Sequence, residues 1–363
     1  MRLYDETTGG PAEIEIRDRM TVYVCGITPY DAAHLGHAFT FAHFDVLVRY
    51  LRYLGSEVVH VQNVTDVDDD ILRVAHERGL DWRELGMKET EKFNSCMREI
   101  GITPPTYSPL ATEFVPDIID EVRAIEAAGA TYEREGTVYF RVKAAPDFGK
   151  LSKLPPEKML ELAAERGGRP DDPNKDDPLD FVLWQRSDDP REPAWQSPWG
   201  PGRPGWHIEC STMARRLLGQ PLDIHGGGVD LVFPHHECEL AQAESVSDEP
   251  FVRHWMHTGN VGLDGEKMSK SLGNLVTVEE LLERHPAETV RRFLLGKHYR
   301  TNWDFDEREL FVDHPRLQLE NARHVFFLAL ENDLDVPAAL AALDGSGDPA
   351  FVEEGRAILG LDL

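Results

Sequence analysis

Two short motifs lie far apart in this sequence: His34-Leu35-Gly36-His37 and Lys267-Met268-Ser269-Lys270-Ser271. The first follows an apolar run at 21–25 and comes just before a helical pattern over about 40–54, so we expect a strand, a turn and a helix start. The free N–H groups at a helix start favour anions, and this order of elements is therefore typical of a nucleotide site. We expect the second motif in a loop after the strand-like Gly262-Leu263.

Four side chains of these motifs, those of His34, His37, Lys267 and Lys270, are suited to act on ATP. The histidines would face phosphate at the helix start, and the two ammonium groups would neutralise charge on the β- and γ-phosphates while the α-phosphorus is attacked. This is adenylation with Mg·ATP rather than kinase chemistry. Paired histidines and serine-containing lysine loops are also common surface features. Both motifs in this order, however, predict the formation of an acyl-adenylate.

A metal site can be predicted from four further residues. Cys25 ends the predicted strand, Cys210 lies far along the chain, and His235 and Glu239 are four residues apart on an expected helix. That spacing places both side chains on one helix face, and sulfur with imidazole and carboxylate oxygen suits Zn²⁺. Alternatively, the two cysteines are ordinary buried thiols and His235 caps a helix. Cys238, three residues after His235, competes with Glu239 as the fourth ligand.

The composition limits the class of protein. With 363 residues the chain can form a large core and is expected to hold two or three domains. Its start, Met1-Arg2-Leu3-Tyr4-Asp5-Glu6, is no basic and apolar leader, and no run of about eighteen apolar residues appears. We therefore expect a cytoplasmic protein without a membrane partner. The 4 cysteines then suit a thiolate metal site better than a disulfide framework.

Several segments carry a family resemblance. Besides the two motifs above, these are Cys-Gly-Ile-Thr-Pro-Tyr-Asp at 25–31, Asn-Val-Thr-Asp-Val-Asp-Asp at 63–69, Gly-Trp-His-Ile-Glu-Cys-Ser at 205–211 and His-Gly-Gly-Gly-Val-Asp at 225–230. With them the chain resembles the class I aminoacyl-tRNA synthetases, and more narrowly their cysteinyl branch, from about residue 21 to 300.

The resemblance implies a zinc ion held by Cys25, Cys210, His235 and Glu239, with Glu239 ranked above Cys238. In the cysteinyl branch the metal also binds the substrate thiol, and this separates cysteine from serine, which a hydrogen-bonding pocket alone does poorly. The resemblance places the cysteine against Thr28 and Trp206. The remaining residues expected to bind ATP or the adenylate are Gly26, Ile27, Thr40, Asn63, Val64, Thr65, Gly228, Val229, Asp230 and Val261.

Two of these segments can also be interpreted from their residues. Gly226-Gly227-Gly228 indicates backbone that passes close to a ligand, with Asp230 free to accept from ribose hydroxyls, although three glycines also occur in ordinary loops. The acids Asp66, Asp68, Asp69 and Asp70 do not fit a calcium loop, because no glycine occupies its sixth position. We expect them at the start of a helix.

Alternating strand-like and helical patterns predict an α/β fold, a Rossmann-like doubly wound parallel sheet with an inserted subdomain. The first half of the catalytic domain is expected at 1–112, the insertion at 113–204 and the second half at 205–245. Residues 246–300 carry the lysine motif and are similar to the stem-contact region of synthetases. Helical patterns predict a small C-terminal bundle at 301–363.

The acceptor of the cysteine separates two families that share this catalytic half: cysteinyl-tRNA synthetases, and the cysteine ligases of mycothiol synthesis, which use the amine of glucosaminyl-inositol. Residues 25–37 are close to the ligase form, and 165–180 resembles a ligase block, with Arg169 where ligases have an acid. The chain has 65 acidic and 38 basic side chains, a net charge of −27, and about sixty residues after Arg300, a poor combination for binding tRNA. Glu239 favours the synthetase, because the ligases generally lack that fourth ligand.

We therefore expect ATP, L-cysteine and the amine of glucosaminyl-inositol as partners, with tRNA-Cys as the less favoured acceptor and no DNA. A non-catalytic relative that only binds adenylate-like ligands is a third alternative. It is disfavoured because both histidines and both lysines of the motifs are present. The sequence identifies no general base for the transfer step, and a free amine can react without one.

Overall fold

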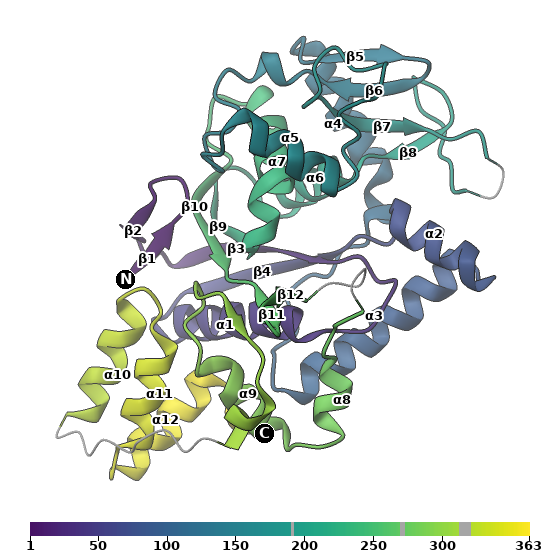
Figure 1. Cartoon of the computed structure of the whole chain (residues 1–363). Helices are drawn as coiled ribbons and strands as arrows, with labels where there is room; N and C mark the ends of the chain where they lie inside the picture. Colours follow the sequence, from purple (N-terminus) through teal and green to yellow (C-terminus); the bar gives the residue numbers. More distant parts are fainter. Residues whose placement is uncertain (190–191, 269–272, 312–320) are drawn as a thin grey trace.

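A parallel sheet forms the centre of the fold. The computed structural model describes residues 1–189, 192–268, 273–311 and 321–363. The sheet has the strand order β10 (Val252–Thr258), β9 (Leu222–Gly228), β3 (Arg19–Ile27) and β4 (Glu57–Val64), and each neighbouring pair is parallel. Helices cover both faces of this sheet (Figure 1). The predicted α/β fold with a parallel sheet is therefore confirmed.

Alternating residues of β3 divide the core into two layers. Met20, Val22 and Val24 share one apolar cluster with α1 (Leu35–Tyr53). Tyr23 and Cys25 point to the other face, into a cluster with α6 (Trp206–Leu218) and α7 (Glu237–Ser245). Because successive side chains of a strand point to opposite faces, Cys25 is directed away from α1 and toward the helix that carries Cys210.

The insertion is a second, antiparallel sheet. Its strands β5 (Thr131–Arg134), β6 (Thr137–Phe140), β7 (Phe181–Arg186) and β8 (Gly202–Pro204) pair in sequence order. Helices α4 (Val115–Ala127) and α5 (Pro156–Glu165) belong to the same part of the chain. In Figure 1 this part lies above the parallel sheet. Since β8 is followed at once by α6, the insertion is joined directly to the helix that carries Cys210.

The C-terminal part packs on the opposite side of the sheet, below it in Figure 1. Strands β12 (Glu266–Lys267), β11 (Val261–Leu263) and β13 (Trp303–Asp304) form a small sheet. Helices α8 (Val278–Leu282) and α9 (Ala287–Leu295) follow, and α10 (Ala322–Glu331), α11 (Val336–Asp344) and α12 (Pro349–Leu359) form the predicted bundle. Residues of α9–α12 lie in the same apolar cluster as α1, so α1 is buried nearly all round.

The starts of α1 and of α2 (Asp69–Arg78) are set by their caps. Helix α1 begins at Leu35, about five residues before the expected apolar pattern, because His34 and His37 form a capping box. Asp68 is the N-cap of α2 and its side chain accepts from the backbone N–H of Asp70, which confirms that these acids start a helix.

The remaining elements are short or peripheral. They are the hairpin of β1 (Arg2–Asp5) and β2 (Gly10–Glu13), helix α3 (Trp82–Glu99), 3₁₀ turns at Ala111–Phe114, Val142–Ala144, Val229–Leu231 and Glu307–Phe311, and a π-type turn at Val232–His236. In the part of the chain that the structure describes, no helix combines the length and the apolar character needed to cross a bilayer.

Candidate functional site

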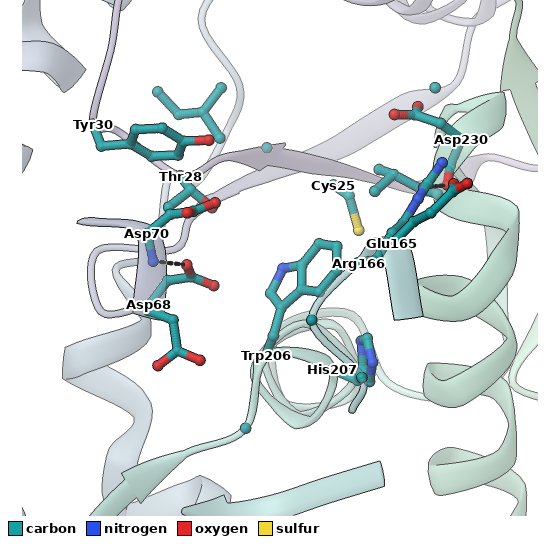
Figure 2. A pocket seen from close by; sticks show the side chains of 18 of the residues that line it. Cys25, Thr28, Tyr30, Asp68, Asp70, Glu165, Arg166, Trp206, His207 and Asp230 are labelled. Carbon is teal, nitrogen blue, oxygen red and sulfur yellow. Dashed lines mark hydrogen bonds between the residues drawn. The ribbon is translucent and has the colours of Figure 1, made fainter. Parts of the chain in front are cut away.

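A cavity of about 860 Å³ lies at the carboxyl ends of β3 and β9. Its wall includes the start of α1, the start of α2, the loop after α5, the start of α6 and strand β11. Figure 2 shows Cys25 and Trp206 in its middle. The carboxyl ends of parallel strands are the usual ligand position in doubly wound folds, and the volume is within the range of small-molecule sites.

Four potential zinc ligands meet next to this cavity, and one of them, Cys25, lines it. The donor atoms of Cys25 (β3), Cys210 (α6), His235 (the π-type turn before α7) and Glu239 (α7) all lie within 4.8 Å of one another, and all four residues are buried. Glu239 Oε1 lies 3.0 Å from His235 Nε2 and 3.4 Å from Cys25 Sγ. Cys238 points elsewhere, into the apolar cluster of the insertion. The placement thus favours Glu239 over Cys238 as the fourth ligand.

The chemistry of this cluster fits a divalent cation. Glu239 is 0% exposed, and its Oε2 has no hydrogen-bond partner among the described residues. Burial raises the pKa of the Glu239 carboxyl and of the Cys25 thiol well above their usual values. Groups held this far from water need an opposite charge to ionise, and sulfur, imidazole and carboxylate oxygen are the donor types that Zn²⁺ takes in proteins. Cys25, Cys210, His235 and Glu239 would hold the ion.

Two histidines that the sequence reasoning missed complete a second donor set. Cys25, His225, His236 and Glu239 also lie within 4.8 Å of one another, with His236 Nε2 3.3 Å from Cys25 Sγ. His225 directly precedes Gly226-Gly227-Gly228, and His236 directly follows His235, so each is next to a residue that the sequence does single out. Their convergence on Cys25 is tertiary, and no sequence spacing indicated it.

The histidine motif lies at the N-terminus of α1, on the cavity wall. The rings of His34 and His37 stack with centroids 3.6 Å apart, and His37 Nδ1 accepts from the backbone N–H of His34. A Cβ on Gly36 would lie 3.0 Å from the His34 ring, so the glycine makes room for this stack. Both histidines are therefore held beside the cavity by the geometry of the helix start.

The lysine motif is described only in part. Lys267 ends β12, which pairs with β11. Met268 is buried and lines the cavity with Val261. Lys270 lies outside the described residues. The small sheet thus brings Met268 of this motif to the same cavity as the histidine motif.

Most of the expected ligand-binding residues line the cavity, and a minority lie behind its wall. The lining includes Gly26, Ile27, Thr28, Thr40, Trp206, Gly228, Asp230 and Val261. Asn63, Val64, Thr65 and Val229 are not part of it.

Asn63 has a structural task instead. Its Oδ1 accepts from Gly26 N at 2.9 Å, and its Nδ2 donates to Thr65 Oγ1 at 3.2 Å. A Cβ on Gly26 would lie 1.7 Å from the backbone oxygen of Asn63. The amide therefore fixes the end of β3, next to Cys25.

Asp230 stands at the opposite end of the cavity from Asp68 and Asp70 (Figure 2). A Cβ on Gly228 would lie 2.5 Å from Asp230 Oδ1, so this glycine lets the carboxylate lie against the backbone. Arg166, which the sequence did not predict as a site residue, donates to the backbone carbonyl of Asp230.

Comparison with known proteins agrees with this geometry. Residues 12–313 match the family model described as tRNA synthetases class I (C) catalytic domain. The chain belongs to this family. A solved structure of methionyl-tRNA synthetase from Mycobacterium tuberculosis in complex with methionyl-adenylate superposes with a TM-score of 0.67 at 17% identity, covering 95% of this chain and 88% of that one. This likeness supports the class I fold.

Three curated members of the family match different shares of this chain. A protein of Nocardiopsis dassonvillei named L-cysteine:1D-myo-inositol 2-amino-2-deoxy-alpha-D-glucopyranoside ligase is 45% identical over 98% of this chain and 90% of its own length. A similarly named ligase of Thermobifida fusca is 45% identical, again over 98% of this chain. A cysteine–tRNA ligase of Syntrophobacter fumaroxidans is 49% identical over 80% of this chain and 58% of its own length.

Proposed function

We propose that this protein activates L-cysteine with ATP and transfers the cysteinyl group to the amine of glucosaminyl-inositol. The observation that carries the proposal is one cavity lined by the histidine motif and by Cys25, which belongs to a buried Cys–Cys–His–Glu cluster. The first suits adenylation and the second suits a thiol substrate. The match to ligases of this name over 98% of the chain supports the acceptor.

In the first step the cysteine carboxylate attacks the α-phosphorus of Mg·ATP, and pyrophosphate leaves. His34 and His37 hold the phosphates at the start of α1, while Lys267 and Lys270 neutralise the charge that develops. Asp230 accepts from the ribose hydroxyls, and Trp206 covers the cysteine. These contacts hold the two substrates in position for the reaction, which is the main task of the protein in such a step.

Zinc, when bound by Cys25, Cys210, His235 and Glu239, supplies a soft cation that keeps the substrate thiol ionised and disfavours serine. In the second step the acceptor amine attacks the activated carbonyl, and AMP leaves. Serine and cysteine differ by oxygen for sulfur, so selection depends on the four donors staying in place.

A cysteine–tRNA ligase is the second candidate, favoured by the 49% identity to the Syntrophobacter fumaroxidans enzyme and by Glu239. Purified protein would be incubated with ATP, Mg²⁺ and radiolabelled cysteine, with glucosaminyl-inositol or a tRNA-Cys transcript in parallel. We expect ATP- and amine-dependent label in the small amide. Label on the tRNA and none in the amide would overturn the proposal and establish the second candidate.

A further inference from the structure

One end of the cavity has no task in the adenylation step. In Figure 2, Tyr30, Asp68 and Asp70 lie on the other side of Cys25 and Trp206 from Asp230. Gln185 of β7 and Arg203 of β8 line the same cavity. We name this set, Tyr30, Asp68, Asp70, Gln185 and Arg203, the acidic end.

The acidic end is held by local hydrogen bonds. Asp68 Oδ1 accepts from the backbone N–H of Asp70 at 2.7 Å as the N-cap of α2. The hydroxyl of Tyr30 hydrogen-bonds the Asp70 side chain. Arg203 donates to Asp69 through Nη2. The carboxylates are therefore oriented before any ligand arrives, which lowers the entropy cost of binding.

Two buried polar side chains near this end have atoms without a hydrogen bond. Arg203 is 9% exposed and lines the cavity; beside the bond of its Nη2 to Asp69, its Nε lies 3.8 Å from Glu192 Oε2 and has no hydrogen-bond partner among the described residues. Glu209 is 0% exposed and interacts electrostatically with Asp68 and Arg203. Neither of its carboxylate oxygens has a hydrogen-bond partner among the described residues. Buried polar groups are nearly always satisfied, so this end is built for a polar ligand or its bound water.

We propose that the acidic end binds the acceptor, an amino sugar linked to a polyol, and that Asp68 receives its amine. This inference rests on the proposed function. Carboxylates accept from an amine and from hydroxyls, while Arg203 and Gln185 donate to hydroxyl oxygens.

The transfer step balances with Asp68 as the proton acceptor. The amine nitrogen forms a bond to the carbonyl carbon of the cysteinyl-adenylate, and the bond from that carbon to the phosphate oxygen breaks. AMP leaves with the electron pair, and the proton lost by nitrogen goes to the Asp68 carboxylate. Burial raises the pKa of Asp68 to about 6, which makes it a better base than an exposed aspartate. The charged or titratable groups near it are Tyr30, Asp69, Asp70, Arg203 and Glu209.

The test separates the two half-reactions in Asp68→Asn. Asparagine is as good an N-cap as aspartate, so α2 should keep its start. Adenylation is measured by cysteine-dependent ATP–pyrophosphate exchange, and transfer by amide formation with glucosaminyl-inositol. We expect kcat/KM for the amine to fall about 100-fold, a usual effect of losing an acid–base group. This loss should be at least about tenfold larger than the loss in the rate of ATP–pyrophosphate exchange.

Asp81→Asn is the matched control, because Asp81 caps α3 in the same way and does not line the cavity. It should change neither half-reaction. If Asp68→Asn transfers cysteine as fast as the unaltered protein, or loses exchange and transfer equally, the acceptor role of Asp68 is wrong. Failure of the unaltered protein to form any amide would instead refute the proposed function.

Discussion

Glu239 Oε1 lies 3.0 Å from His235 Nε2, one turn away on the same helical segment. Neither side chain is more than 1% exposed. A carboxylate this deep is costly unless a cation or a donor offsets its charge. The other groups nearby are two buried cysteines and the imidazoles of His225 and His236, all of them potential metal ligands, so the cluster suits a metal ion.

Removal of Cys210 should therefore release zinc. Substitution of residues that only hydrogen-bond the metal ligands weakens metal binding by about 10- to 100-fold. Loss of a ligand itself, in Cys210→Ala, should therefore weaken zinc binding by at least about 100-fold. Zinc content is measured by mass spectrometry after dialysis, with Cys96→Ala as the control, since Cys96 is half-buried on α3 and outside the cluster. Stoichiometric zinc in Cys210→Ala would contradict the assignment. Loss of zinc in His236→Gln would then favour the second donor set.

The lysine motif should act on the rate of adenylation. Lys270→Ala is expected to slow cysteine-dependent pyrophosphate exchange by about 100-fold, as for other losses of transition-state charge stabilisation, while the dissociation constant of ATP rises much less. Rapid-quench kinetics and equilibrium binding measure the two effects separately. Lys297→Ala, a substitution of a lysine that pairs with Glu309, is the control. Equal losses in rate and in ATP binding would count against the role.

Gly26→Ala should destabilise the protein. A Cβ at this position would lie 1.7 Å from the backbone oxygen of Asn63, so β3 and the residues after it must shift. We expect a loss of about 3 kcal/mol in the free energy of unfolding, typical of overpacking. Gly10→Ala, where a Cβ meets nothing within 4 Å, is the matched control. Urea unfolding measures both, and equal stability of the two variants would show that the strand end adapts.

Stability should fall in acid because of His60. Burial lowers its pKa to about 4, against an ordinary value of about 6.5. Above about pH 6.5 the ring is neutral in both states; as the pH falls toward 4, only the unfolded chain takes up the proton, and about 3 kcal/mol is lost. His60→Leu should remove that part of the pH dependence. Urea unfolding at several pH values checks this, with the exposed His324→Leu as the control. An unchanged pH dependence in His60→Leu would refute the assignment.

Arg291 should link the C-terminal helices to α1. It is 0% exposed and donates to Asp45 at 2.6 Å and to the backbone oxygens of Leu359 and Ile100. Arg291→Met leaves the Asp45 carboxylate buried with one partner fewer, so we expect a loss of about 3 kcal/mol. The double variant with Asp45→Asn should recover part of it. Additive losses in this cycle, measured by urea unfolding, would show that the pair is not coupled.

Local features were predictable from the sequence. The start of α2 followed from its run of aspartates, because an N-cap depends on neighbours within three residues. The parallel sheet followed from buried apolar runs that alternate with helical patterns. Other boundaries were less exact: α1 begins at Leu35 rather than near residue 40, since its first turn is held by histidines and not by an apolar stripe.

What the sequence by itself determined is the chemistry available: two motifs for ATP, and sulfur, imidazole and carboxylate for a metal. Only the tertiary structure decided which donors meet. The pleat of β3 turns Cys25 toward Cys210, and the rotation of α7 turns Glu239 inward and Cys238 into the insertion core. Contacts such as those of His236 with Cys25, or of Arg203 with Asp69, join strands and helices far apart in sequence, and no local spacing encodes them.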